Sequence, residues 1–247
     1  TLFGDLQMPD VIPPKLPDCT PWTLTEWLDH EKDITGIFLS GHPLDHFRFE
    51  MKHYGITTIA EFIEFKDTLL SNPNPFRQFR IAGLVSDAQH RTTRNGKQFG
   101  VFSLEDYSGK TELALFGEDY VRFKDHFSLG NVLFATGNFK ASWNSTTDFE
   151  FKLSSVMLLE TVKKLLTRQV EAELHPKFLT EETVAFIDNN VKSFPGKSGI
   201  KFVLSEPRLG WKVSMYTLEK GFEMNDEMAA FLETNPDIEV KVTTLEK

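Results

Sequence analysis

Residues 79–160 contain the pattern that most restricts the fold of this chain: five strand-like segments interrupted once by a helix. Within these segments apolar and polar residues alternate with the two-residue period of a half-buried strand. The strands are predicted at about 79–92, 98–106, 111–116, 131–141 and from Phe149 onward. Between the third and fourth strands, Tyr120, Phe123 and Phe127 fall on one side of a short amphipathic helix. Three strands, a helix and two further strands is the order of a five-stranded OB barrel.

The first two of these strands meet at Asn95-Gly96, a strong hairpin signal. The pair is typical of a type I′ turn, which needs positive φ at both central residues. The second strand should turn Phe102 and Leu104 to one face and Phe99 to the other. The tip is cationic, and no carboxylate occurs between Ala88 and Leu104. Its basic residues are His90, Arg91, Arg94 and Lys97.

The candidate binding residues follow from the way OB barrels hold single-stranded nucleic acid. They use strands two and three and the loops that join strands one to two and four to five. Cations in these places can follow phosphates, and aromatic rings can stack on bases. The candidates are Arg91, Arg94, Lys97, Phe99, Lys140 and Trp143. The alternative is a solvated hairpin tip, with Trp143 closing one end of the barrel.

The charge balance limits how such a site can work. The chain has a formal net charge of −9, which argues against a protein that coats nucleic acid electrostatically. Residues 79–160 are nearly neutral, with nine basic and ten acidic side chains. The sequence therefore predicts a nucleic-acid contact that is local and weak.

The segments on either side of the barrel complete an α+β, multidomain fold. Residues 1–21 are rich in proline and predict an extended linker or strap, 22–70 predict a helical connector, and 71–78 a second linker. Within the connector, helices are expected from Trp22 to about Leu39, from Pro43 onward, and from a Thr58–Glu61 capping box to about Leu70. After the OB domain at 79–160, residues 161–247 predict strand, helix, two strands, helix and strand. This β-α-β-β-α-β order is typical of a split βαβ domain. The six elements are expected at 169–175, 180–192, 200–205, 211–218, 225–234 and 237–243.

No residue pattern predicts catalysis, a metal site or a cofactor. His42 and His46 have the spacing of two metal ligands on a helix, but Pro43 lies between them and no third ligand is suitably placed. The single cysteine, Cys19, excludes an internal disulfide. No apolar run reaches the roughly 20 residues of a membrane span, and we expect a cytoplasmic protein. Because the chain begins at Thr1, we expect it to be part of something longer.

Two stretches of the chain resemble a known family. They are "HEKDITGIFLSGHPLDHF" and "FRIAGLVSDAQHRTTRNGKQFGVFSLEDYSGKTELALFGEDY". Both are similar to the C-terminal portion of the bacterial replicative DNA polymerase III alpha subunit. Residues 161–247 match that portion in layout more than in motif. The resemblance covers the helical connector, the OB domain and the C-terminal domain.

The resemblance implies a role for each part. The OB domain would contact single-stranded template DNA, and the C-terminal domain would dock the clamp-loader tau subunit. Leu2 and Phe3 resemble the truncated end of a sliding-clamp motif of the form Gln-x-x-Leu-Phe. The catalytic domains of this DNA-directed DNA polymerase are absent from the sequence. A non-catalytic fragment without the Mg²⁺ of the polymerase is therefore expected.

Two other classes of protein remain open at this point. An OB domain also occurs in the anticodon-binding region of aminoacyl-tRNA synthetases, although the "SGHPLD" element is not expected ahead of one. A pure interaction scaffold would use the same barrel face to bind protein.

Overall fold

The computed structural model describes residues 22, 24–36, 38–69, 76–141, 149–206, 208–216 and 221–245. The chain divides into two compact units, Thr1–His42 and Pro43–Lys247. In the first unit, helix α1 (Leu24–Thr35) confirms the predicted helix near this position. The Glu31 carboxylate accepts hydrogen bonds from the backbone N–H groups of Leu39 and Ser40, at 2.9 and 2.8 Å. The predicted strap at 1–21, with Leu2 and Phe3, lies outside the described residues.

The second unit begins with three short helical segments, η1 (Pro43–Phe47), α2 (Arg48–His53) and α3 (Ile59–Asp67). The sequence predicted one helix from Pro43, but its first five residues form a 3₁₀ turn. The predicted capping box of α3 is confirmed: Thr58 accepts from the Glu61 N–H, and the Glu61 carboxylate accepts from the Thr58 N–H. The carboxylate of Asp106, from the barrel, accepts from the Ile59 N–H at 2.8 Å and fixes α3 against the sheet.

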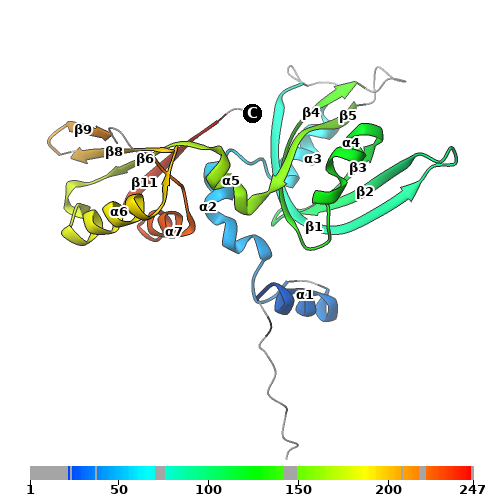
Figure 1. The fold of residues 1–247 in the computed structure, drawn as a ribbon, viewed down its shortest axis with the longest axis horizontal. Coiled ribbons are helices and arrows are strands. Elements are labelled where there is room, and N and C mark those ends of the chain that lie inside the picture. The colour runs from blue at the N-terminus through cyan, green and yellow to red at the C-terminus, as the bar shows by residue number, and fades with distance from the viewer. Residues whose placement is uncertain are drawn as a thin grey trace, which may run out of the picture. The chain divides into compact units, whose positions relative to one another are not determined.

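The OB domain is a five-stranded antiparallel sheet in the order β3-β2-β1-β4-β5, which confirms the predicted fold (Figure 1). Helix α4 and the 3₁₀ turn η3 separate β3 from β4, as predicted. The elements are β1 (Gln78–Thr92), β2 (Gln98–Glu105), β3 (Lys110–Phe116), α4 (Gly117–Phe123), η3 (Lys124–His126), β4 (Val132–Ala141) and β5 (Phe149–Leu158). The inner face is apolar, and α3 inserts Phe62 and Phe65 against Phe79 and Phe139. Aromatic rings of α3 thereby close one side of the barrel core.

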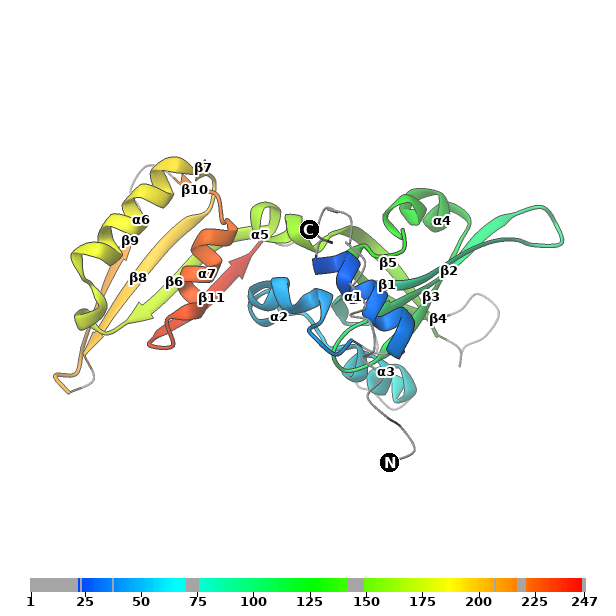
Figure 2. The same cartoon turned by 90° about the horizontal axis from the view of Figure 1, so that it is seen from below.

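The remaining chain forms a four-stranded mixed sheet, β11-β6-β8-β9. Its elements are α5 (Leu159–Leu166), β6 (Thr167–Leu174), η4 (Pro176–Phe178), α6 (Glu181–Ser193), β7 (Pro195–Gly196), β8 (Gly199–Glu206), β9 (Trp211–Tyr216), β10 (Gly221–Phe222), α7 (Asp226–Thr234) and β11 (Ile238–Thr244). Helices α6 and α7 lie on the same face of this sheet (Figure 2). The predicted order of strands and helices is present, with α5 and the short β7–β10 pair in addition.

The pairing of these strands differs from the predicted split βαβ. In that arrangement another strand separates the two strands that a helix connects, whereas β6 and β8, joined through α6, are direct parallel neighbours. The β8–β9 hairpin is then added on the outside. Both arrangements bury the same apolar row of β6, Val170, Ala172 and Leu174, so the alternation in the sequence does not distinguish them.

A second apolar core continues across the predicted domain boundaries. It joins Leu44, Phe49 and Tyr54 of the connector to Ala82 and Phe134 on the outside of the barrel, and to α5, β6 and α7. Hydrogen bonds follow the same junction. The Tyr54 hydroxyl lies 2.6 Å from Thr167 Oγ1, and Arg80 donates to the Tyr54 carbonyl at 3.1 Å and to Thr244 Oγ1 at 2.8 Å. The boundaries at 78/79 and 160/161 stay predictions. No described helix is long and apolar enough to cross a membrane.

Candidate nucleic-acid interface

The hairpin between β1 and β2 has the predicted strands but a different turn. The ladder runs to Thr92 opposite Gln98, and the Thr93 N–H donates to the Lys97 carbonyl at 2.8 Å. The Gly96 N–H donates to the Thr93 carbonyl at 2.9 Å, so Arg94 and Asn95 are the central residues. Among the described residues only glycines have positive φ, and Gly96 has φ of +75°. The type I′ prediction is therefore wrong. A turn without positive φ at its central residues is followed by a glycine in the left-handed conformation, and this combination also fits the twist of the two strands.

The three predicted cations lie on this tip and are exposed: Arg91 at the end of β1, Arg94 in the turn and Lys97 after it. Within the described part of the chain, no carboxylate forms an ion pair with any of them. Arg91 donates to the Gln89 amide oxygen, and Gln89 in turn donates to Asp87 at 2.7 Å. The positive charge at the tip is therefore available to an anionic ligand.

Phe99 lies beside these cations on the outer face of the barrel. It is paired across the strands with Arg91 on one side and with Phe116 on the other. The Phe99 and Phe116 rings stack with centroids 5.2 Å apart and planes inclined by 13°. Phe116 is 51% exposed. One cation and two stacked rings thus form a row across β1, β2 and β3.

Phe116 was not among the predicted site residues. The signal that could have found it is the alternation in β3: Thr111, Leu113 and Leu115 are buried, which turns Phe116 outward. Its stacking on Phe99 depends on the β2–β3 register, which the sequence does not specify.

A groove of about 180 Å³ continues from Phe116 between β3 and β5. Its lining is aromatic, with Lys66 and Lys152 among the polar groups. The aromatic residues are Phe62, Phe116, Phe139, Phe149 and Phe151. The Lys152 ammonium group lies 3.0 Å from the Glu150 carboxylate and 3.9 Å from that of Asp119. The groove therefore combines ring faces with a cation that is partly neutralised.

The second predicted loop is only partly described. Lys140 is exposed near the end of β4, where its cross-strand partner is Glu150. Trp143 lies outside the described residues. The structure thus brings Arg91, Phe99 and the turn cations together, while Lys140 lies on β4, opposite Glu150 of β5.

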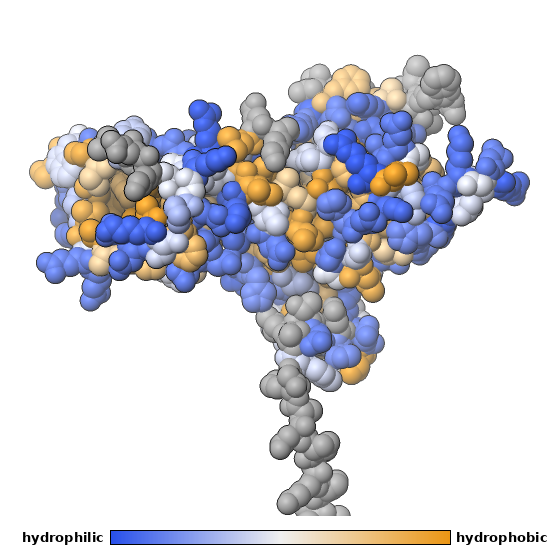
Figure 3. Space-filling model, in the orientation of Figure 1, coloured by the Kyte–Doolittle hydropathy of each residue, from blue (hydrophilic) through white to orange (hydrophobic). Residues whose placement is uncertain are grey.

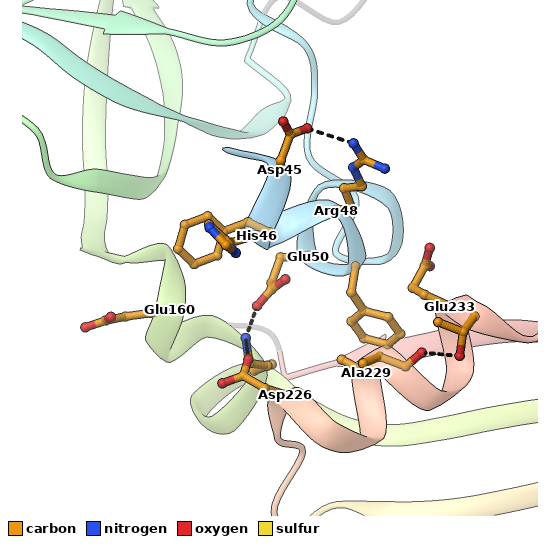
Figure 4. Close-up of a pocket in the computed structure, with 13 residues that line it drawn as sticks. Asp45, His46, Arg48, Glu50, Glu160, Asp226, Ala229 and Glu233 are labelled. Carbon is orange, nitrogen blue, oxygen red and sulfur yellow. Dashed lines mark hydrogen bonds and ion pairs between the residues drawn. The ribbon is translucent and has the colours of Figure 1, made fainter. Parts of the chain in front are cut away.

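A larger hollow of about 680 Å³ lies between η1–α2 and α7, and an ion-pair cluster of Glu50, Lys163 and Asp226 lines it (Figure 4). Lys163 contacts the buried Glu50 carboxylate and, at 2.7 Å, that of Asp226. Burial by itself would lower the pKa of Lys163, but hydrogen bonds and charges from Asp226 and Glu50 raise it above its ordinary value. Burial also lowers the pKa of His53, against the opposing effect of Glu233 at 2.9 Å. The ion pairs around this hollow hold α2 to α5 and α7.

The described residues contain no group of three His, Cys, Asp or Glu side chains that could hold a metal ion. His42 packs edge-on against Phe38, with ring centroids 5.1 Å apart.

Two family models match the two folded halves. The OB-fold nucleic acid binding domain matches residues 79–159, and the C-terminal domain of the DNA polymerase III alpha subunit matches residues 170–243. The chain is related to the C-terminal region of DNA polymerase III alpha subunits. This confirms the resemblance seen in the sequence.

Individual alpha subunits agree with this assignment. That of Haemophilus influenzae is 26% identical over 166 residues, which are 65% of this chain and 14% of the relative. That of Borreliella burgdorferi is 23% identical over 256 residues, which are 100% of this chain and 20% of the relative. The chain therefore spans about a fifth or less of the length of these relatives. A mitochondrial single-stranded DNA binding protein from S. cerevisiae is 15% identical over 34% of this chain and 96% of its own, with a TM-score of 0.26, too low to bear on function.

Proposed function

We propose that this chain is a non-catalytic part of a replicative DNA polymerase whose OB domain holds single-stranded template DNA. The observation that carries the proposal is the row formed by Arg91, Phe99 and Phe116, next to the cations of the hairpin tip. Stacked rings give an unpaired base a flat surface whatever its identity, and cations beside them neutralise the backbone.

The same row would make the OB domain prefer single-stranded over duplex DNA. The bases of a duplex are already stacked and paired, so their faces cannot reach Phe116. Arg94 and Lys97 on the projecting turn can contact phosphates, and the groove between β3 and β5 can accept the next base. Because the domain is nearly neutral, its binding should be weak and should depend on the rest of the polymerase for avidity.

A titration with single-stranded DNA, duplex DNA and tRNA tests the proposal at two salt concentrations. Each neutralised phosphate of a single strand contributes a slope of about −0.7. The triple variant Arg91→Ala, Arg94→Ala, Lys97→Ala should therefore flatten the salt dependence by about two units. Phe116→Ala should instead remove about 1–3 kcal/mol of stacking and leave the slope unchanged.

Matched controls separate these effects from a general loss of charge or apolar surface. Lys177, Lys192 and Lys197 are exposed cations of the C-terminal domain, and changing all three to alanine should leave DNA binding intact. Leu129 is 70% exposed on the barrel, and Leu129→Ala controls for Phe116→Ala. Tighter binding of tRNA than of DNA would favour the synthetase alternative. Binding of no nucleic acid would favour the scaffold.

The remaining parts of the proposal concern partners and chemistry. The C-terminal α+β domain would dock a clamp-loader subunit such as tau, and the observation in favour is a row of exposed apolar side chains on β9. The fragment would add no nucleotide to a primed template with Mg²⁺, and incorporation that survives purification would contradict this. As part of a bacterial replication enzyme, it would act in the cytoplasm. Sliding-clamp binding through Leu2 and Phe3 stays a prediction.

A further inference from the structure

Strand β9 has an open edge. It ends the sheet β11-β6-β8-β9 and pairs with β8 alone among the described strands. All six of its residues are exposed. The outward-facing N–H and C=O groups of such a strand can receive another extended segment.

One face of β9 is apolar although it belongs to the core side of the sheet. The register places Met215 opposite Phe202 and Val213 opposite Leu204, with Trp211 following on the same face. Yet Trp211, Val213 and Met215 remain 38%, 47% and 37% exposed. Helices α6 and α7 pack together through Phe186 and Phe231, and this row stays only partly covered. Figure 3 shows apolar side chains gathered at this end of the C-terminal domain, over the strands and the neighbouring α6.

The edge lacks the usual protection against pairing with another chain. Exposed edge strands are normally shielded by charged side chains that point along or across the edge. The only charged residue of β9 is Lys212, on the opposite face from the apolar row. Its ammonium group lies 2.6 Å from the Glu173 carboxylate of β6, two strands in from the edge. The apolar row itself contains no charge.

The charge around the edge indicates what kind of segment would fit. Arg208 and Lys212 are the only charged residues of the described stretch 208–216, and both are exposed. The acidic residues of the neighbouring strands are already paired, Glu171 with Lys201 and Glu173 with Lys212. Lys212 is neutralised by Glu173, so Arg208 is the cation of this stretch that takes part in no ion pair among the described residues. Glu206 of β8 is also paired, with His175, so no unpaired carboxylate of β6 or β8 opposes an acidic segment at this edge.

We propose that β9 is a docking edge for a partner protein that adds one extended strand to the sheet. The added strand has apolar residues at alternate positions, which cover Trp211, Val213 and Met215, and acidic residues between them. Main-chain hydrogen bonds supply part of the affinity, and the alternating side chains supply the specificity. The inference rests on the proposed docking role of the C-terminal domain and assigns that role to one edge.

The direct test uses the 247-residue chain and three labelled heptapeptides in fluorescence anisotropy. The first alternates valine or leucine with aspartate or glutamate, the second has lysine in place of the acids, and the third has the first composition in two blocks. The acidic alternating peptide should bind at least about tenfold more tightly than either of the others. N-methylation of its alternate amides should abolish binding, because the ladder hydrogen bonds are then blocked. Equal binding of all peptides, or of none, would overturn the proposal.

Two substitutions on the same strand locate the site. Val213→Asp places a charge in the apolar row and should weaken binding of the acidic alternating peptide at least about tenfold. Ser214→Lys places a charge on the opposite face, beside the acidic residues of the added strand, and should not weaken its affinity, with equal thermal stability of both variants as the check on folding. Similar losses in both variants would contradict the assignment. So would sedimentation showing a wild-type dimer that Val213→Asp dissociates, because the occupant would then be a second copy.

Binding of the clamp-loader subunit separates the docking role of the C-terminal domain from the assignment of that role to β9. If the wild-type chain binds it and Val213→Asp binds it equally well, the docking role stands and the β9 assignment falls. If the wild-type chain does not bind it at all, the docking role itself falls. Binding that Val213→Asp loses and Ser214→Lys keeps supports both.

Discussion

Removing the Lys163 ammonium group should be among the most destabilising single changes in this chain. Lys163 lies between two carboxylates, the buried one of Glu50 and the exposed one of Asp226. Glu50 is 1% exposed. In Lys163→Met the Glu50 carboxylate would stay buried without its counter-charge. Breaking a buried pair in this way costs about 3–5 kcal/mol.

Substitutions of the other two members of the cluster, Glu50 and Asp226, should lower the free energy of unfolding less than Lys163→Met does, Asp226 least. Glu50→Gln leaves Lys163 with Asp226 and should cost about 1.5–3 kcal/mol, the range for a hydrogen bond to a charged group. The Asp226 carboxylate is largely exposed, so Asp226→Asn should cost no more than about 1 kcal/mol. The double variant Glu50→Gln, Lys163→Met removes both charges and should recover much of the loss caused by Lys163→Met alone.

Urea unfolding followed by far-UV circular dichroism measures these differences, with Glu160→Gln as a control at an exposed residue of the same hollow. The pKa of Lys163 is raised in the folded chain, so its stabilising contribution is complete at neutral pH and is lost only as the pH rises through that value. A Lys163→Met variant that loses less than about 1 kcal/mol at pH 7, or a double variant that is less stable than Lys163→Met, would refute the reasoning.

Three further outcomes are expected. Gly137→Ala would place its Cβ 2.4 Å from the Lys152 carbonyl oxygen, so it should cost about 1–3 kcal/mol in urea unfolding, whereas Gly109→Ala, with its nearest atom at 3.9 Å, should cost little. Tyr54→Phe loses the hydrogen bond to Thr167 and should cost about 0.5–1.5 kcal/mol; no loss at all would mean that this buried bond is replaced. Burial lowers the pKa of His53 below 6.5, so the unfolded chain binds the proton more readily and stability should fall as the pH drops below 6.5; His53→Gln should reduce that fall, and an unchanged pH profile would contradict it.

The sequence predicted the parts of the fold that short-range patterns determine. Alternation located every strand of the barrel, and the Thr58–Glu61 capping box located the start of α3. It missed α5, because "LETVKKLL" is eight residues long and lies between two strands without a capping side chain at Leu158. The predicted turn type at Asn95-Gly96 was wrong because the hydrogen bond between Thr93 and Lys97 encloses three loop residues rather than two.

The candidate site was predictable only where one loop contains it. Arg91, Arg94 and Lys97 lie within seven residues of one another, so their gathering at one tip follows from the hairpin alone. Phe116 reaches Phe99 through the β2–β3 register, and Glu50 meets Lys163 across 113 residues of chain. Contacts of this kind depend on which surfaces pack together, and local periodicity contains no information about that.

The apolar core that joins residues 43–69, the barrel and the C-terminal sheet has a consequence for exchanging parts between related chains. Ala82 and Phe134 belong to the OB sheet but are buried with Leu166 and Val170. A chimera joined near residue 160 would bring foreign side chains against this core and against the ends of the Arg80 hydrogen bonds. A graft of residues 43–247 as one piece leaves the core whole. The segment that can be exchanged without repacking the core is therefore longer than either matched family domain.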